Sequence, residues 1–255
     1  MKAIILAAGK GERLKDITQT LPKPMIEFRG KPILLHNIEL CKKYGIEDIY
    51  INVHHLPEKI TNYFGDGEKF GVSIQYSYET ELLGTAGAVK KIAKEFWNIQ
   101  KLQDSKIPRF QHSNIPLRHS SDSFFVIYGD NFSNYDLNLL IEKQQETNSS
   151  CVIGFHYRED TSHSGVAEFD KDGRILRFIE KPKEGETESH WVNAGVYLLN
   201  SSTLDLISDG FFDFGKDVFP LMLGKNIPMY GICSHSEVKA FDNLEMYNNN
   251  LKDNK

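Results

Sequence analysis

Short runs of β-branched and aromatic residues alternate with amphipathic stretches between residues 3 and 130. The runs are AIIL (3–6), DIYINVHH (48–55), VSIQYSY (72–78) and FFVIYGD (124–130), and helical patterns cover 32–44, the residues after Pro57, and 85–97. This order is typical of β-α-β units whose strands are buried on both faces. We therefore expect an α/β fold, doubly wound around a mostly parallel sheet, with ligands bound beyond the carboxyl ends of the strands.

The rhythm changes after residue 150. Residues 166–180 (VAEFDKDGRILRFIE) predict two strands around an Asp-Gly turn, and residues 191–200 (WVNAGVYLLN) and 228–233 (PMYGIC) predict two more. Further helices are expected at 202–208, shortly before Pro220, and at 244–251. We expect one domain over residues 1–255, with a smaller β-rich part at about 155–235.

Composition argues against several classes of protein. The chain has 255 residues, 40% of them hydrophobic, which is enough to bury a large core. A net charge of −5 argues against nucleic-acid binding and against an anionic membrane surface. Three widely spaced cysteines favour neither a disulfide framework nor a cysteine zinc site. No stretch approaches the roughly 18 apolar residues of a membrane span, so we expect a cytoplasmic protein.

Residues 98–122 form a long polar segment without a clear period, which is unusual within a compact domain. Its basic residues are compatible with an RNA contact. A solvated surface insertion, at the sheet end opposite the site, is the favoured interpretation. A contact within a homo-oligomer is a further alternative.

The loop after the first apolar run is the first candidate site. In LAAGKGERL (6–14), Gly9 and Gly11 can adopt positive φ, so that successive N–H groups surround phosphate oxygens, and Arg13 can add a charged contact. The GxGxxG dinucleotide pattern fails because Leu14 stands where the third glycine belongs, and the chain has no GxxxxGK[ST]. A purely structural turn is the alternative.

A lysine between two prolines follows this loop. Pro22 and Pro24 fix the backbone on either side of Lys23, which aims its ammonium group at one place. An ordinary surface lysine is the alternative. The short distance in sequence from the glycine loop favours a phosphate clamp.

Together, LAAGKGERLKDITQTLPKPM (6–25) resembles the signature of the sugar-1-phosphate nucleotidylyltransferases. Motifs similar to those of the family follow in the family's order: LGTAGA (83–88), YGD (128–130), IEKP (179–182) and NAGVY (193–197). The resemblance implies a Rossmann-like nucleotide-diphospho-sugar transferase fold with a small β-rich sugar-binding subdomain. It also implies transfer of a nucleotidyl group from a nucleoside triphosphate to a sugar 1-phosphate, for synthesis of nucleotide sugars and cell-surface polysaccharide.

The resemblance assigns roles to individual residues. The catalytic residues would be Arg13, Lys23 and Asp130. The nucleotide would lie against Leu6, Ala7, Ala8, Gly9, Gly11, Glu79, Leu83, Gly84 and Thr85. The sugar phosphate would be bound by Gly165, Glu180, Lys181, Asn193 and Asp217. Magnesium would be held by Asp130 and Asp242, because Mg²⁺ favours carboxylate and phosphate oxygens.

Several of these residues have simpler explanations when each is taken alone. Asp130 fits a Gly-Asp turn, Lys181 a strand end, Asn193 a strand bulge and Asp217 the first turn of a helix. Asp242 lies in AFDNLEMY (240–247), where many members of the family carry a DIGTP-like segment. We interpret the nine histidines as structural or surface residues, since the pair at 54 and 55 has no third zinc ligand at suitable spacing.

The nucleobase and the sugar are harder to predict than the reaction. PKPM followed by LGTAGA favours GTP with a manno- or heptose-type 1-phosphate, and uridylyl- or cytidylyltransferases of other sugars are the alternatives. A non-catalytic nucleotide-sensing relative is a rival, although the charged residues named above are retained. A glycosyltransferase of related fold would need an Asp-x-Asp, and residues 130–132 (DNF) do not provide one.

Overall fold

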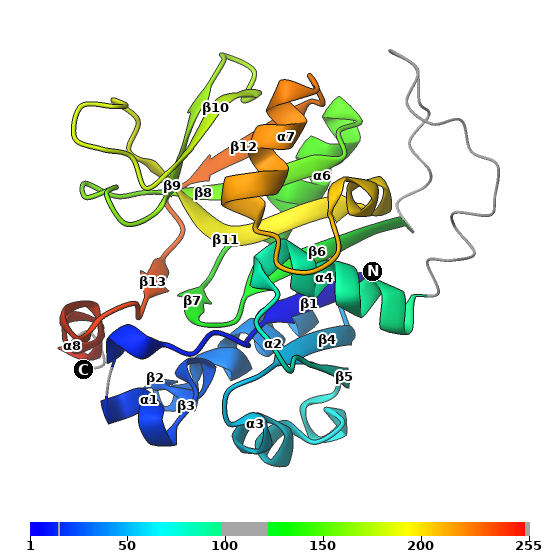
Figure 1. Cartoon of the computed structure of the whole chain (residues 1–255), viewed down its shortest axis with the longest axis vertical. Coiled ribbons are helices and arrows are strands. Elements are labelled where there is room, and N and C mark those ends of the chain that lie inside the picture. Colours follow the sequence, from blue (N-terminus) through cyan, green and yellow to red (C-terminus); the bar gives the residue numbers. More distant parts are fainter. Residues whose placement is uncertain (15, 98–121, 253–255) are drawn as a thin grey trace.

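The computed structural model describes residues 1–14, 16–97 and 122–252. The predictions for the polar segment therefore concern residues that, except for residue 122, lie outside the described ranges. The described chain forms a nine-stranded mixed sheet with helices on both sides and two small sheets of two strands each (Figure 1).

The first half of the chain forms the parallel part of the sheet. Four strands lie in the order β5-β4-β1-β6, and all three neighbouring pairs are parallel. Their bounds are Lys2–Leu6 for β1, Asp48–Val53 for β4, Ser73–Tyr78 for β5 and Ser123–Tyr128 for β6. Parallel strands place their carboxyl ends at one edge of the sheet, which is where the site lies.

Alternate residues of β1 face opposite sides of the sheet, and both sides are buried. Ala3 and Ile5 belong to the core shared with α2 and α3, whereas Ile4 and Leu6 belong to the core shared with α4. These helices span Ile33–Lys43 (α2), Pro57–Phe64 (α3) and Gly84–Phe96 (α4). The doubly wound arrangement predicted from the continuous apolar runs is confirmed.

The second half adds strands in both directions. The long strand β11 (Trp191–Asn200) is antiparallel to β6 and also pairs with β8 (Cys151–Tyr157) and β9 (Gly165–Phe169). The predicted hairpin is present, because β9 pairs with β10 (Ile175–Glu180) across a turn in which Gly173 has φ of 82°. The strand β12 (Met229–Ser234) runs parallel to β8 at the sheet's far end.

The remaining helices and short strands complete the fold. The α-helices are α1 (Asp16–Thr20), α6 (Leu137–Thr147), α7 (Phe219–Gly224) and α8 (Leu244–Lys252). Single turns of 3-10 helix occur at η1 (Glu12–Leu14), η2 (Lys23–Met25) and η3 (Glu68–Phe70). A longer 3-10 helix forms η5 (Ser201–Leu206), and η6 (Phe214–Val218) is a π-helix. The small sheets pair β2 (Glu27–Phe28) with β3 (Lys31–Pro32), and β7 (Asn131–Ser133) with β13 (Val238–Ala240).

Neither β8 nor α6 was expected from the sequence, and the short elements α1, β2, β3, β7 and β13 were not expected either. The strand β8 has Gly154 and His156 within its apolar run, which weakens the strand pattern. The helix α6 has only three buried residues in its 11, so its apolar face is short. The expected helix at 202–208 is a 3-10 turn at Ser201–Leu206.

The N-terminal and C-terminal parts of the chain meet in a separate small core. Leu14, Ile26 and Phe28 pack there with Phe132 and Phe241. Figure 1 shows α8 and β13 beside the N-terminal segment. This core includes Phe132, two residues after Asp130, and Phe241, the residue before Asp242. It therefore fixes the distance between two distant parts of the sequence.

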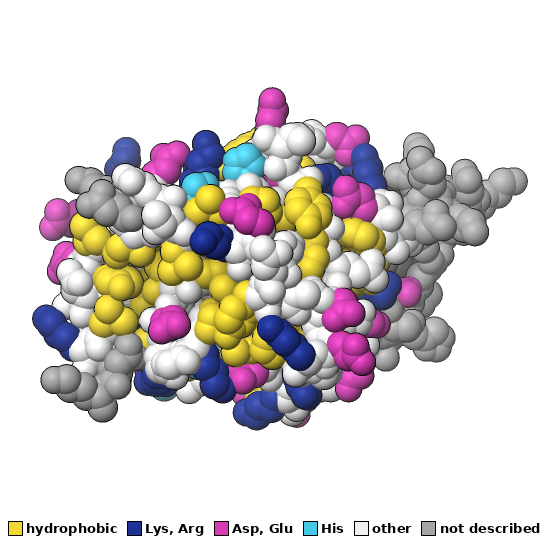
Figure 2. Space-filling model, turned by 90° about the horizontal axis from the view of Figure 1, so that it is seen from below, with side chains coloured by type: hydrophobic (Ala, Val, Ile, Leu, Met, Phe, Trp, Pro, Cys, Tyr) yellow, Lys and Arg dark blue, Asp and Glu magenta, His cyan; other side chains and the backbone are white. Residues whose placement is uncertain are grey.

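The described surface carries charges of both signs. On the face drawn in Figure 2, basic and acidic side chains are interspersed, with hydrophobic side chains exposed between them. Within the described ranges, no helix is both long and apolar enough to cross a membrane.

The small core supports a stability prediction. The side chain of Phe241 is fully buried, and its ring lies 5.5 Å from that of Phe28. Phe241→Ala is therefore expected to lower the free energy of unfolding by about 3–5 kcal/mol, measured by urea titration. Leu176→Ala, at a side chain that is 55% exposed, is the control and should change it little. Equal effects of the two substitutions would contradict the prediction.

Candidate active site

A chain of hydrogen bonds joins the loop after β1, the end of β4 and the loop after β5. The backbone N–H of Ala7 donates to Asn52 Oδ1 at 2.7 Å, and Asn52 Nδ2 donates to Glu79 Oε1 at 2.7 Å. The other carboxylate oxygen of Glu79 accepts from the Leu83 N–H at 3.0 Å, at the start of α4. Asn52 was not identified from the sequence, because an isolated asparagine in an apolar strand belongs to no motif.

The two glycines of the first loop differ in what they do. Gly11 has φ of 63°, and a Cβ there would lie 2.8 Å from a methyl group of Thr18, so the tight turn requires glycine. Its carbonyl accepts from the Thr18 hydroxyl at 3.0 Å. Gly9 has open space around the position of a Cβ and borders a cavity. In this loop, therefore, Gly11 is needed for the tight turn, whereas the backbone at Gly9 is accessible from the cavity.

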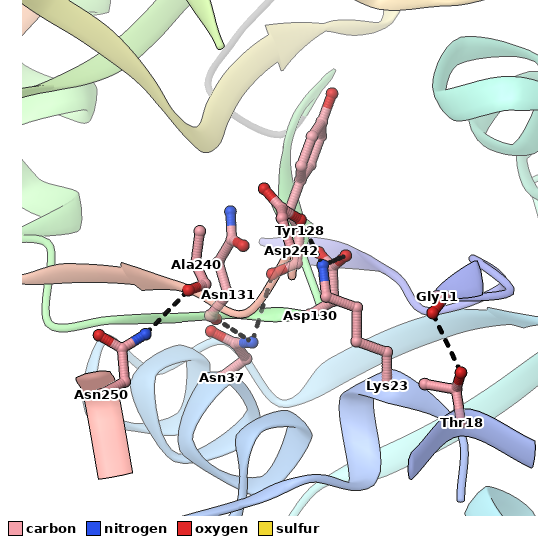
Figure 3. A network of polar contacts seen from close by, with 10 residues as sticks. All are labelled: Gly11, Thr18, Lys23, Asn37, Tyr128, Asp130, Asn131, Ala240, Asp242 and Asn250. Carbon is pink, nitrogen blue, oxygen red and sulfur yellow. Dashed lines mark hydrogen bonds and ion pairs between the residues drawn. The ribbon is translucent and has the colours of Figure 1, made fainter. Parts of the chain in front are cut away.

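Lys23 forms the central ion pairs of the site. Its Nζ lies 2.6 Å from Asp130 Oδ2 and 2.6 Å from Asp242 Oδ1, and the residue is only 4% exposed. Figure 3 shows the lysine side chain extended toward both carboxylates. The turn at Lys23–Met25 follows from the two prolines, and the β7–β13 pairing brings the residue after Asp130 opposite Ala240. The prediction that the prolines aim this ammonium group at one place agrees with the geometry.

The ion pairs set the protonation of these groups. Burial by itself lowers the pKa of Lys23, but the charges and hydrogen bonds of the two aspartates outweigh it and raise this pKa above its usual value. For Asp242, burial raises the pKa, and the positive charges of Lys23, Arg13 and Arg158 reverse that effect, so the pKa is lowered. Lys23 is therefore an ammonium ion and Asp242 a carboxylate at neutral pH.

Two cavities open on either side of this cluster. The first, of about 230 Å³, contains seven predicted nucleotide-binding residues in its lining: Leu6, Ala7, Ala8, Gly9, Glu79, Gly84 and Thr85. The second, of about 220 Å³, contains four predicted sugar-site or metal-site residues besides Asp130: Gly165, Glu180, Asn193 and Asp242. Asp130, Thr85, Tyr128 and Asp213 line both cavities, so the two spaces meet at these residues.

The motif NAGVY forms an irregular section of β11 beside the second cavity. The Asn193 side chain accepts from the Gly195 N–H at 2.9 Å and donates to the Tyr197 hydroxyl at 2.7 Å. The register of β11 shifts between Asn193 and Tyr197, and Gly195 has φ of 69°. The bulge expected as a simple explanation is therefore present, and it places Asn193 in the cavity lining.

Glu180 lies at the end of β10 and faces the same cavity. Burial raises its pKa, the nearby negative charge of Asp213 adds to this, and Lys181 and Lys216 oppose it. A Cβ at Gly165 would lie 2.9 Å from a carboxylate oxygen of Glu180, so glycine allows the side chain to pass closely.

The other predicted residues lie outside the cavity linings. Lys181 is exposed with φ of 54°, and Arg13 is exposed. Leu83 contributes its backbone to Glu79, as described above. Asp217 accepts from the Asp213 N–H at 2.7 Å, so it stabilises the start of η6. The binding roles given to these residues stay predictions.

Asp213 occupies a more central position than the sequence indicated. One oxygen accepts from the Thr85 hydroxyl at 2.9 Å, and the other from the backbone N–H groups of Gly215 and Lys216. It thereby ties the start of α4 to η6. An aspartate two residues before a glycine at a helix start is a capping signal, and that signal was available in the sequence.

The histidines have several environments. His54 and His55 contact the backbone carbonyls of Glu79 and Thr18, so both are held structurally. His156 and His163 line the second cavity, which the sequence did not indicate. In the described residues, no group of three or more His, Cys, Asp or Glu is placed to hold a metal.

Comparisons with known proteins show the family of the chain. Residues 2–238 match the family described as Nucleotidyl transferase, and the chain belongs to that family. It is 36% identical over 244 residues to a UTP--glucose-1-phosphate uridylyltransferase of Synechocystis, covering 91% of this chain and 58% of that protein. It is 34% identical over 222 residues to mannose-1-phosphate guanylyltransferase 1 of Arabidopsis thaliana, covering 86% and 55% respectively.

The solved structures share the fold. HddC from Yersinia pseudotuberculosis, solved in complex with GMP-PN, has a TM-score of 0.74 and 22% identity, covering 100% of this chain and 99% of that one. The chain spans little more than half the length of the two curated relatives above.

His156 gives a prediction for stability against pH. Burial, with the Arg158 charge, lowers its pKa to about 4, whereas an unfolded histidine titrates near 6.5. Between these values the unfolded chain binds more protons, so stability falls as pH falls through this window, by about 3 kcal/mol in total. His156→Gln should remove most of this loss.

The measurement is the free energy of unfolding in urea at pH 7 and at pH 4.5, compared between variants. His163→Gln is the matched control, because that side chain lines the same cavity but is exposed. A His156→Gln protein that keeps the full pH dependence of the wild type would exclude this histidine as its source.

Proposed function

We propose that the chain transfers a nucleotidyl group from a nucleoside triphosphate to a sugar 1-phosphate, with release of pyrophosphate. The preferred substrates are GTP and a manno- or heptose-type 1-phosphate. The observation that carries this proposal is the meeting of two cavities at Asp130, beside the Lys23 ion pairs. Two phosphate-bearing substrates placed in these cavities would have their reacting groups at that junction.

The reaction needs no general base. A sugar 1-phosphate is largely dianionic at neutral pH, because the second pKa of a phosphate is about 6. One of its oxygens attacks the α-phosphorus of the triphosphate. A new phosphorus–oxygen bond forms while the bond to the bridging oxygen breaks, and pyrophosphate leaves with that electron pair.

The protein's task is to hold two polyanions together in line. The open backbone at Gly9 and the exposed Arg13 are suited to the triphosphate. Lys23 places one permanent positive charge at the junction of the cavities, where charge develops on the equatorial oxygens. The side chains of Glu180 and Asn193 offer hydrogen-bonding groups to sugar hydroxyls.

A magnesium ion fits the residues present. Asp130 and Asp242 each place a carboxylate oxygen within 2.6 Å of the same cation, the Lys23 ammonium, so the two oxygens converge on one region. Mg²⁺ is commonly bound by one or two carboxylates together with substrate phosphates. We propose that these two aspartates hold it. When bound, the ion supplies positive charge to the phosphate oxygens.

The choice of GTP rests on the chemistry of Glu79. This residue is 6% exposed and borders the first cavity. Its two oxygens each accept one hydrogen bond from the protein, from Asn52 and Leu83, and each has a second lone pair that can accept another. Guanine offers neighbouring N1–H and N2–H donors to such a carboxylate. Uracil has a carbonyl oxygen on each side of its single N–H, and a carboxylate repels these oxygens. Phe211, 65% exposed at the same cavity, offers a ring on which a base can stack.

A uridylyltransferase is the second candidate. The Synechocystis uridylyltransferase is as similar to this chain as the Arabidopsis guanylyltransferase is. A cytidylyltransferase is a further alternative for the base. A non-catalytic nucleotide-sensing relative is disfavoured, because the lysine and both aspartates of the junction are present and joined.

The decisive experiment is a matrix of five nucleoside triphosphates against a panel of sugar 1-phosphates, read by release of pyrophosphate with Mg²⁺ present. Pyrophosphate release that depends on both substrates supports the proposal. Transfer from an intact nucleotide sugar, or no release with any pair, would refute it.

Removal of a charge at the junction is expected to slow the reaction. Lys23→Ala and Asp130→Asn should each lower kcat by about 10²- to 10³-fold, because each removes a group that acts on the reacting phosphates. The matched controls are Lys225→Ala and Asp172→Asn, at exposed positions. Circular dichroism checks that the variants are folded. Near-normal turnover in either junction variant would remove that residue from the mechanism.

Base selection is expected to depend on Glu79. Glu79→Gln replaces one acceptor oxygen by a donor, so the KM for GTP should rise by about 10- to 100-fold, as for loss of a charged hydrogen bond, while the KM for UTP should not rise. Glu81→Gln, at an exposed residue in the same turn, is the control. An unchanged ratio of the two KM values would contradict the role given to Glu79.

A further inference from the structure

The second cavity is mainly acidic. Four carboxylates line it: Asp130, Glu180, Asp213 and Asp242. Among its lining residues, all drawn from the described part of the chain, Arg158 is the one lysine or arginine. A phosphate dianion that enters this space therefore needs positive charge beyond that of Lys23, which is already shared by two aspartates.

The backbone of Arg158 is held firmly at the carboxyl end of an interior strand of the main sheet. The residue follows β8, which is paired on one side with β11 and on the other with β12. Its N–H donates to the His190 carbonyl at 3.0 Å, and its carbonyl contacts His190 Nδ1 at 3.1 Å. A side chain on such a rigid support can be positioned accurately.

The guanidinium group of Arg158 is available to a ligand. Over residues 1–14, 16–97 and 122–252, no hydrogen bond or ion pair within 4 Å joins it to another side chain. The residue is half-buried and borders the cavity. An arginine that is partly withdrawn from water without a partner has donors left to satisfy.

The charge of Arg158 acts on the interior of the site. Burial, with the added positive charge of Arg158, lowers the pKa of His156. His156 and Arg158 line the same cavity. Arg158 therefore adds positive potential to the space assigned to the acceptor.

The lysine expected to bind the sugar phosphate is less favourably placed. Lys181 is exposed and does not border the cavity. Its backbone is fixed by the bond from its N–H to the Ser164 carbonyl at 3.1 Å and by its positive φ. An exposed lysine makes a weaker and more strongly screened contact with a phosphate than a half-buried guanidinium does.

We propose that Arg158 binds the phosphate of the sugar 1-phosphate through its guanidinium group and thereby positions the attacking oxygen opposite the triphosphate. This inference rests on the proposed function and adds a residue that none of the sequence motifs contains. The planar guanidinium can donate two parallel hydrogen bonds to one phosphate. Arg158 and Lys23 then neutralise the acceptor and the transferred phosphate from different segments of the chain.

The test separates the two substrates kinetically. KM for the sugar 1-phosphate is measured at saturating triphosphate, and KM for the triphosphate at saturating acceptor. Arg158→Ala should raise the acceptor KM by about 10- to 100-fold and leave the triphosphate KM within about twofold. Arg158→Lys keeps the positive charge but cannot donate two parallel hydrogen bonds, so its acceptor KM should lie between those of the wild type and Arg158→Ala.

The controls distinguish this role from a structural one. Arg177→Ala removes an exposed arginine that pairs with Glu168 and should change neither KM. Circular dichroism of Arg158→Ala, and of Arg158→Gln as a longer replacement, confirms folding. Lys181→Ala is expected to raise the acceptor KM less than Arg158→Ala does.

The outcomes that overturn the inference are distinct from those that overturn the proposed function. Wild-type acceptor KM in folded Arg158→Ala, or an equal rise of both KM values, would refute the role of Arg158 while the activity itself stands. A wild-type protein that releases no pyrophosphate with any substrate pair would refute both.

Discussion

The ion pairs of Lys23 with Asp130 and Asp242 are the constraint on which the site depends. They join residues 107 and 219 positions apart in the sequence, from the turn η2, the segment after β6 and the segment after β13. Two carboxylates this close repel each other, so the ammonium between them is needed for the segments to stay together. The small core around Phe28 and Phe241 holds neighbouring parts of the same segments together with apolar contacts.

The sequence predicted those features of the structure that depend on residues close together in the chain. The buried runs at 3–6 and 124–130 gave parallel strands, and hence the position of Asp130 at a carboxyl end of the sheet. The prolines around Lys23 predicted a fixed direction for its side chain. The partners of that side chain could not be derived from local pattern, because they depend on how β7 and β13 pair across more than 100 residues of chain.

The residues missed by the sequence analysis, Asp213 and Arg158, belong to none of the family motifs. Asp213 and Asp217 both occur in the same short stretch, and only the tertiary contact of Asp213 with Thr85 distinguishes the residue at the cavities from the one at the helix start. Arg158 follows β8, and β8 was not predicted because Gly154 and His156 interrupt its apolar pattern. Once the strand is missed, the cavity position of the residue after it is missed as well.

The charges around the junction support the proposed roles of both Lys23 and Arg158. Unit charges 4 Å apart interact by about 4 kcal/mol at the effective dielectric of a protein surface. A phosphate dianion placed beside Asp130 and Asp242 meets two such repulsions for each of its charges, and Lys23 is already committed to both aspartates. Because the pKa of Lys23 is raised, the lysine stays charged at neutral pH and keeps its ion pairs with both aspartates. The proposed contact of Arg158 with the acceptor, and the proposed magnesium ion between the carboxylates and the phosphates, would balance the remaining charge.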